Sequence, residues 1–177
     1  MSSRTEHNMQ YLTEALLGEF LNKTYSSKWI HDKQFVEGKV RPDYRNDTEH
    51  LIVEFDGYLH YTKATQIIKD EEKDVLYKAH GYNIIRIPYF VQLSNEISVL
   101  LFNRSNSNPL SYPHGFIDSK AVLPCDFCEL GVQRFLQDLN KYVIIKDDIV
   151  KSLKNKVTEL GNVNKVLPPS IQYLIES

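Results

Sequence analysis

Two short acidic motifs combine the side chains best suited to chemistry in this sequence. The first reads Arg41-Pro-Asp43-Tyr44 and the second reads Glu54-Phe-Asp56-Gly57-Tyr58-Leu-His60, with ten residues between Asp43 and Glu54. Alternate side chains of an extended strand share one face, so every second residue from Glu54 to His60 would project the same way. Two carboxylates and an imidazole would then lie on one surface.

A hairpin that paired the two motifs would bring Asp43 beside Glu54. Like charges that close raise each other's pKa and cost free energy unless a cation lies among them. Mg²⁺ is typically bound by one or two carboxylates together with waters and the phosphate oxygens of a substrate. Such an ion polarises a phosphoryl oxygen and lowers the pKa of a bound water. The motifs therefore predict a Mg²⁺ site, with Mn²⁺ as a substitute, suited to phosphodiester hydrolysis.

The candidate residues receive separate roles in this prediction. Asp43 and Glu54 would hold the metal, and Asp56 would ligate it or orient the attacking water. His60 would transfer protons, because the unperturbed pKa of histidine, about 6.5, lies near neutral pH. Acidic residues on an exposed strand face are usually only solvated, but this strand is expected to be central, where unpaired carboxylates are costly.

The elements that must position these residues follow an α/β pattern. Apolar residues at three- and four-residue spacings predict a helix over residues 9–22, with Glu14 at the edge of its apolar face. Strands are expected over 29–36, 39–44 and 50–60, with a turn at Glu37-Gly38. A helix over 64–80 is expected to bury Ala64, Ile68, Val75 and Ala79 and to stop at Gly81, before a buried strand over 82–87.

The remainder of the chain reads as a loop and a helical extension. Residues 103–115 are polar and rich in turn formers, and helices are expected over about 127–141, about 146–160 and shortly after Pro168. The expected organisation is an α/β core over 1–102, a loop over 103–115 and a helical extension over 116–177, packed as one structural unit. Six lysines of the last third are either an ordinary solvated surface or part of a polynucleotide track: Lys141, Lys146, Lys151, Lys154, Lys156 and Lys165.

Composition excludes several classes of protein. With 177 residues, 42% hydrophobic and 25% charged, the chain is typical of one globular domain rather than a disordered or collagenous protein. No apolar run approaches the roughly 20 residues that span a bilayer, and the first residues lack the apolar core of a secretion signal. Cys125 and Cys128 are too few for a disulfide framework. A soluble cytoplasmic protein is expected, without a membrane or a small-molecule cofactor as partner.

Taken in order, the motifs resemble those of the PD-(D/E)XK nuclease superfamily, and within it the branch like the very-short-patch repair endonucleases. The resemblance rests on the two acidic motifs, on Asp70-Glu-Glu-Lys73-Asp74 and on Gly81-Tyr82-Asn-Ile-Ile-Arg86, and covers about residues 12–90. It implies a restriction-endonuclease-like core: a helix, a three-stranded antiparallel sheet, a crossover helix and a further parallel strand. It also implies metal-dependent cleavage of DNA, with Glu14 supporting a metal-bound water.

One position departs from the superfamily pattern. The usual Lys two residues after the Glu is Asp56 here, as in the Glu-x-Asp-Gly-x-x-His subgroup. Another group must then position the water. Lys63, Lys69 and Lys73 are candidates for that cation, or ordinary surface lysines.

Other residues allow two interpretations each. Tyr58 is the best candidate for an aromatic contact with DNA, and Arg86 either faces a phosphate or pairs with a core acid. Asp70 and Asp74 are expected to form local pairs with Lys73 and its neighbours. Cys125 and Cys128 with His114 fall short of a closed zinc site, and Asp126 with Glu129 fits a helix cap and its capping partner.

The sequence thus favours a metal-dependent endonuclease of restriction or repair type acting on DNA. Cutting both strands would favour a homodimer. A non-catalytic nuclease-fold module that binds DNA or a partner protein is the alternative, and a metal-binding regulatory or toxin-like protein is a third.

Overall fold

The chain folds into two compact units. The computed structural model describes residues 11–107, 109 and 113–176. The first unit, called the sheet unit, contains Met1–Asp56 and Glu71–Tyr112, and the second, called the helical unit, contains Gly57–Asp70 and Pro113–Ser177. The expected boundaries at residues 102 and 116 stay predictions.

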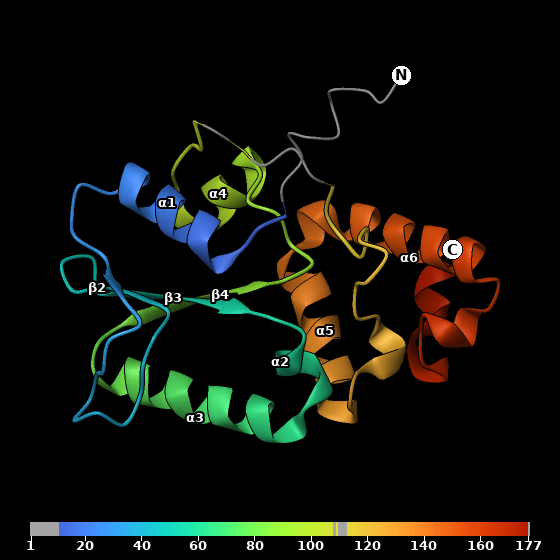
Figure 1. Ribbon diagram of the computed structural model, residues 1–177, viewed down its shortest axis with the longest axis horizontal. Helices are drawn as coiled ribbons and strands as arrows, with labels where there is room; N and C mark the ends of the chain where they lie inside the picture. The colour runs from blue at the N-terminus through green and yellow to red at the C-terminus, as the bar shows by residue number, and fades with distance from the viewer. Residues whose placement is uncertain (1–10, 108, 110–112, 177) are drawn as a thin grey trace. The chain divides into compact units, whose positions relative to one another are not determined.

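A four-stranded mixed sheet organises the sheet unit (Figure 1). Its strands are β1 (Ile30–His31), β2 (Tyr44–Asn46), β3 (Leu51–Asp56) and β4 (Asn83–Pro88), in that spatial order. β1, β2 and β3 pair antiparallel, whereas β4 pairs parallel to β3. The expected α/β class and this order of strands are confirmed.

Helices lie on both faces of this sheet. α1 (Glu14–Thr24) and α4 (Asn95–Phe102) cover one face, and the part of α3 (Ala64–Ala79) from Glu71 onward covers the other (Figure 1). Phe20 of α1 packs against Phe102 of α4, with ring centroids 5.2 Å apart. On the α3 face, Ile52 and Tyr77 are both fully buried in one apolar cluster.

The strands are shorter than the sequence suggested. β3 ends at Asp56, and residues Leu59–Thr62 form a short helix, α2, so the prediction that one strand carries both Glu54 and His60 is wrong. The predicted strand over 39–44 is also wrong, since β2 begins at Tyr44. A turn at residues 36–39 between the bridged residues Phe35 and Val40 replaces the expected long hairpin.

The helix over 64–80 is confirmed, but its buried face was misassigned. Ile68 and Val75 are 46% and 70% exposed. Ile67, Asp70 and Tyr77 are buried instead. The buried face of α3 therefore carries the Asp70 carboxylate and the Tyr77 phenol. The apolar side chains that predicted the buried face lie on the exposed side of the helix.

Helices make up most of the helical unit. Besides α2 it contains α5 (Glu129–Lys141), α6 (Lys146–Leu160) and the 3-10 helices η2 (Pro124–Asp126), η3 (Val143–Ile145), η4 (Val163–Lys165) and η5 (Pro169–Ile175). The helices expected near 127–141, near 146–160 and after Pro168 are confirmed. The expected loop over 103–115 falls partly outside the described residues. In the described part of the chain no helix is long and apolar enough to cross a bilayer.

Close contact between α2 and α5 yields a stability prediction. The Cβ of an alanine at position 131 would overlap the carbonyl oxygen of Tyr61, a backbone atom that cannot rotate away. Overpacking of this kind costs about 3 kcal/mol. We expect Gly131→Ala to lower the free energy of unfolding by that amount in urea denaturation. Gly57→Ala is the control, because a Cβ there meets nothing within 4 Å. Equal stability of the two variants would contradict the close packing.

Candidate metal centre

Asp43 and Glu54 lie side by side where β2 and β3 pair. The register sets Tyr44 opposite Val53, so the next pair outward is Asp43 and Glu54. The Asp43 amide donates to Glu54 Oε2 at 3.3 Å, and the Phe55 amide donates to Asp43 Oδ2 at 2.7 Å. Each carboxylate thus accepts a hydrogen bond from the neighbouring segment. The juxtaposition expected from the two motifs is present.

The electrostatics of this pair are unfavourable for two anions. Burial raises the pKa of Asp43, the charge of Glu54 raises it further, and the result is a pKa of about 7. The hydrogen bond from the Phe55 amide acts in the opposite direction but is outweighed, and the charge of Glu14 adds to the increase. Near neutral pH a proton or a cation is therefore needed to relieve the repulsion.

Neutral groups supply the remaining contacts of the pair. Tyr77 of α3 donates its hydroxyl to Glu54 Oε1 at 2.9 Å. Burial, followed by the charge of Glu54, raises the pKa of Tyr77, so the phenol stays protonated as a donor. Among the described residues, neither Asp43 nor Glu54 forms an ion pair with a basic side chain. Two carboxylates without a cationic partner are a donor set that fits a hard divalent ion.

Glu14 stands at the first turn of α1 and contributes charge to the same site. Its carboxylate contacts His31 Nε2 at 2.6 Å, and its backbone carbonyl accepts a hydrogen bond from the Tyr44 hydroxyl at 2.9 Å. The side chain is 45% exposed, so solvent reaches it. The structure thus places Glu14 near Asp43, while its role with a metal-bound water stays a prediction.

Asp56 lies further along the same strand but has a cationic partner. Arg86 Nη1 donates to Asp56 Oδ1 at 2.8 Å, and the same guanidinium contacts both oxygens of Asp74. The Asp56 side chain is 1% exposed. Of the two readings of Arg86, pairing with a core acid is the one observed. The local pair of Asp74 with Lys73 was wrong, because Asp74 pairs with Arg86.

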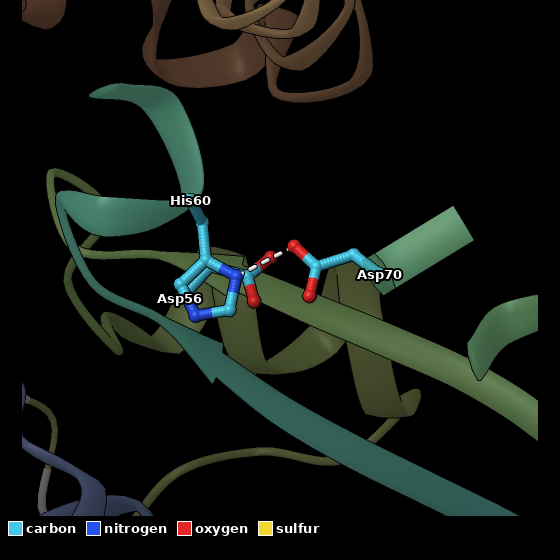
Figure 2. A group of neighbouring side chains, drawn as sticks. All are labelled: Asp56, His60 and Asp70. Carbon is cyan, nitrogen blue, oxygen red and sulfur yellow. Dashed lines mark hydrogen bonds and ion pairs between the residues drawn. The ribbon is translucent and has the colours of Figure 1, made fainter. Parts of the chain in front are cut away.

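His60 belongs to the helical unit, on α2. Its Nδ1 lies 2.6 Å from Asp70 Oδ2, as the dashed line in Figure 2 shows. The Asp70 carboxylate is 3% exposed and also accepts from Arg134 Nη1 at 2.7 Å and from Gln66 Nε2 at 3.0 Å. Asp56, drawn in the same figure, is the last residue of β3.

Asp70 therefore fixes the orientation of the His60 ring. A carboxylate on Nδ1 favours the tautomer with its proton on that nitrogen. The expected local pair of Asp70 with Lys73 was wrong, since its partners are His60, Gln66 and Arg134.

Three of the four other candidates for substrate or water contact are exposed in the helical unit. Tyr58 is 50% exposed and precedes α2, whereas Lys63 is exposed at the end of that helix. Lys69 is exposed as well, and Lys73 of the sheet unit is half-buried. The roles of Tyr58 and of these lysines stay predictions.

The cysteine segment forms a helix start without the expected cap. Asp126 lies within η2, and the residue that precedes α5 is Cys128, which makes no side-chain capping bond, so the Asp126 cap was wrong. Cys125 Sγ contacts the Lys165 carbonyl oxygen at 3.0 Å, and burial raises the pKa of its thiol.

Sequence reasoning missed the residues that hold the candidates in place. Tyr77 was read as one position of a helix, and Arg134 lies 64 residues from Asp70. A helical pattern indicates neither a hydroxyl partner nor a long-range ion pair. The only hint in the sequence that α3 buries polar groups was the pair Asp70 and Asp74, four residues apart on one side of the helix.

Comparison with known proteins adds no assignment. No family model, no curated protein and no solved structure matches this chain.

The partners of Arg86 lead to a second prediction. Removing one member of a buried ion pair costs about 3–5 kcal/mol, because the remaining charge stays desolvated. We expect Arg86→Met to lower the free energy of unfolding by about 3 kcal/mol, and Asp56→Asn in the same chain to restore part of it. Arg41→Met is the control, since its pair with Asp32 is 58% exposed on both sides and costs below about 1 kcal/mol. If Arg86→Met costs no more than Arg41→Met in urea denaturation, the structural role of Arg86 is wrong.

The raised pKa of Asp43 leads to a third prediction, on the pH dependence of stability. Between about pH 4 and pH 7 the folded chain holds a proton on Asp43 that the unfolded chain has released, so stability falls as pH rises through this window. At about 1.4 kcal/mol per pKa unit, the loss is of order 4 kcal/mol. In urea denaturation without divalent ions, Asp43→Asn should remove this decline. Asp118→Asn is the control, an exposed Asp whose Oδ1 accepts from the Lys120 amide. A decline equal in wild type and Asp43→Asn would refute the assignment.

Proposed function

We propose that this protein is a metal-dependent endonuclease that hydrolyses phosphodiester bonds of DNA. The observation that carries the proposal is the Asp43 and Glu54 pair, in which burial and mutual repulsion raise the pKa of Asp43 to about 7. A magnesium ion, or manganese in its place, relieves that repulsion and recruits the phosphate oxygens of a substrate.

Each residue of the site has a defined task in this proposal. Asp43 and Glu54 hold the metal, which when bound polarises a phosphoryl oxygen and acidifies water. Tyr77 orients Glu54 through its hydroxyl, and the Phe55 amide orients Asp43. Glu14 adds negative charge at the edge of the site. His60, held by Asp70 within the helical unit, stays the candidate for proton transfer that the sequence motif suggested.

The order of elements supports the same proposal. A helix, three antiparallel strands, a crossover helix and a parallel strand succeed one another along the chain, as the resemblance to PD-(D/E)XK nucleases implied. The proposal includes a cytoplasmic location and DNA as partner, with a homodimer if both strands are cut.

The non-catalytic alternative also has an observation in its favour. Asp56 is engaged by Arg86, and Glu54 already accepts two hydrogen bonds, so both carboxylates have partners without a metal. A nuclease-fold module that only binds DNA or a protein would retain these contacts. Cleavage activity separates the two functions.

A fourth prediction tests the proposed activity. Wild-type protein with Mg²⁺ or Mn²⁺ should convert supercoiled plasmid to nicked or linear forms, and EDTA should abolish this. Glu54→Gln keeps the size of the side chain and one accepting oxygen but removes a metal-binding charge, so we expect a fall of at least about 100-fold in rate, or about 2.7 kcal/mol.

Its control is Glu19→Gln, an exposed carboxylate of α1 that is 63% accessible. This variant should cut as fast as wild type. Isothermal titration calorimetry should detect Mg²⁺ uptake by wild type and by Glu19→Gln, and little by Glu54→Gln. Equal cleavage by wild type and Glu54→Gln, or equal Mg²⁺ uptake, would rule out this centre.

A further inference from the structure

One histidine of the sheet unit lies beside the segment that carries Asp43. His31 is the second residue of β1, and its side chain is 54% exposed. The register of β1 with β2 sets His31 opposite Tyr44, the residue that follows Asp43. The amide of Asp32 donates to the Asp43 carbonyl oxygen at 3.1 Å, so the two backbones stay paired past the end of β1. His31 is therefore fixed next to the backbone of the candidate metal centre.

Two contacts hold the His31 ring in one orientation. Its plane stacks on the Tyr44 ring, with centroids 4.7 Å apart and an angle of 22° between the planes. Its Nε2 lies 2.6 Å from Glu14 Oε1, and because an ionised carboxylate only accepts, the imidazole donates this hydrogen bond. The Tyr44 hydroxyl donates in turn to the backbone carbonyl of Glu14 at 2.9 Å. The three residues form a closed network that joins α1, β1 and β2.

The pair of His31 and Glu14 adds little to the stability of the fold. Both side chains are about half exposed, and water already solvates charges at that exposure. Among the described residues, no third His, Cys, Asp or Glu joins the pair in a group that could hold a metal of its own. The position of Glu14 indicates a different role.

Glu14 links this network to the metal centre. Its charge raises the pKa of Asp43, so the two carboxylates interact. In the described part of the chain, however, Glu14 does not converge with Asp43 and Glu54 closely enough for all three to bind one ion directly. A water of the metal can bridge that separation, because Mg²⁺ usually keeps several waters. His31 occupies Oε1 of Glu14, whereas Oε2 forms no hydrogen bond with any described residue.

We propose that His31 is a positioning residue of the metal centre, which holds the Glu14 carboxylate so that its Oε2 accepts a hydrogen bond from a metal-bound water. The inference rests on the proposed function, since it needs the ion at Asp43 and Glu54. A carboxylate fixed by a histidine does not rotate freely, so the water meets an acceptor that is already in place. Loss of such an outer contact weakens metal binding by about 10- to 100-fold.

The test measures Mg²⁺ affinity of the full chain by titration calorimetry, without DNA. We expect His31→Leu to weaken Mg²⁺ binding about tenfold. His31→Gln keeps an amide donor near the position of the imidazole Nε2 and should bind within about threefold of wild type. His31→Asn carries its amide nitrogen near the position of Nδ1, too short to reach Glu14, and should bind as weakly as His31→Leu. All three variants lose the ring stack on Tyr44, so a purely structural role predicts equal losses.

A double-mutant cycle tests whether His31 acts through Glu14. Glu14→Gln should weaken Mg²⁺ binding about tenfold, and adding His31→Leu to it should change the affinity by less than about twofold. Glu19→Gln, an exposed carboxylate of the same helix, is the control and should bind Mg²⁺ as wild type does. Unchanged affinity in His31→Leu, equal losses in His31→Gln and His31→Asn, or additive effects in the cycle would each overturn the inference.

Plasmid cleavage separates this inference from the proposed function. His31→Leu should need about tenfold more Mg²⁺ to reach half of its maximal rate, while its rate at saturating Mg²⁺ stays within about threefold of wild type. A chain whose Mg²⁺ binding depends on His31 but that does not cut would refute the proposed activity alone. A chain that cuts, and binds Mg²⁺ equally well without the imidazole, would refute the role of His31 alone. Absence of Mg²⁺ uptake by wild type would refute both.

Discussion

Repulsion between two carboxylates, the half-buried Asp43 and the buried Glu54, is the constraint around which the sheet unit is arranged. The pair exists because Tyr44 is opposite Val53 in the β2 and β3 register. Side chains alternate along a strand, so a slip of one residue would move Asp43 to the opposite face from Glu54. The short strand β2, only three residues long, therefore determines whether the site forms at all.

The sheet unit tolerates this repulsion because its neighbours stabilise the carboxylates without cancelling their charge. Backbone amides and the Tyr77 hydroxyl donate to them, and these donors are neutral. The opposite face of the sheet is apolar by contrast, with Phe20, Tyr25 and Phe102 in mutual ring contact. Apolar packing thus lies on both faces, and on the α3 face it surrounds two carboxylates that need a proton or a metal.

Sequence patterns predicted what depends on local order and missed what depends on distant partners. The helix over 64–80 and the Asp43 and Glu54 juxtaposition follow from short-range periodicity and one hairpin, whereas three antiparallel strands followed by a parallel strand were expected from the family resemblance. The end of β3 at Asp56 could not be predicted in this way, because the alternation of polar and apolar residues continues through His60 while the backbone turns into α2. The buried face of α3 was missed for a related reason. Asp70 and Tyr77 are buried by partners such as Arg134 and Glu54, which no periodicity of the helix itself reveals.

The acidic residue at position 56 has a physical explanation in the parallel pairing of β3 with β4. Glu54 is the register partner of Arg86, which turns its guanidinium toward Asp56 and Asp74. A lysine at position 56 would place a second cation against that guanidinium in a buried site, and like charges there are costly. Asp56 and Arg86 thus depend on each other. Because β4 carries a largely buried arginine, a carboxylate on the adjacent strand β3 is needed to balance its charge. Arg86 of the neighbouring strand is thus paired with Asp56 and Asp74, whereas among the described residues Asp43 and Glu54 form no ion pair with a basic side chain.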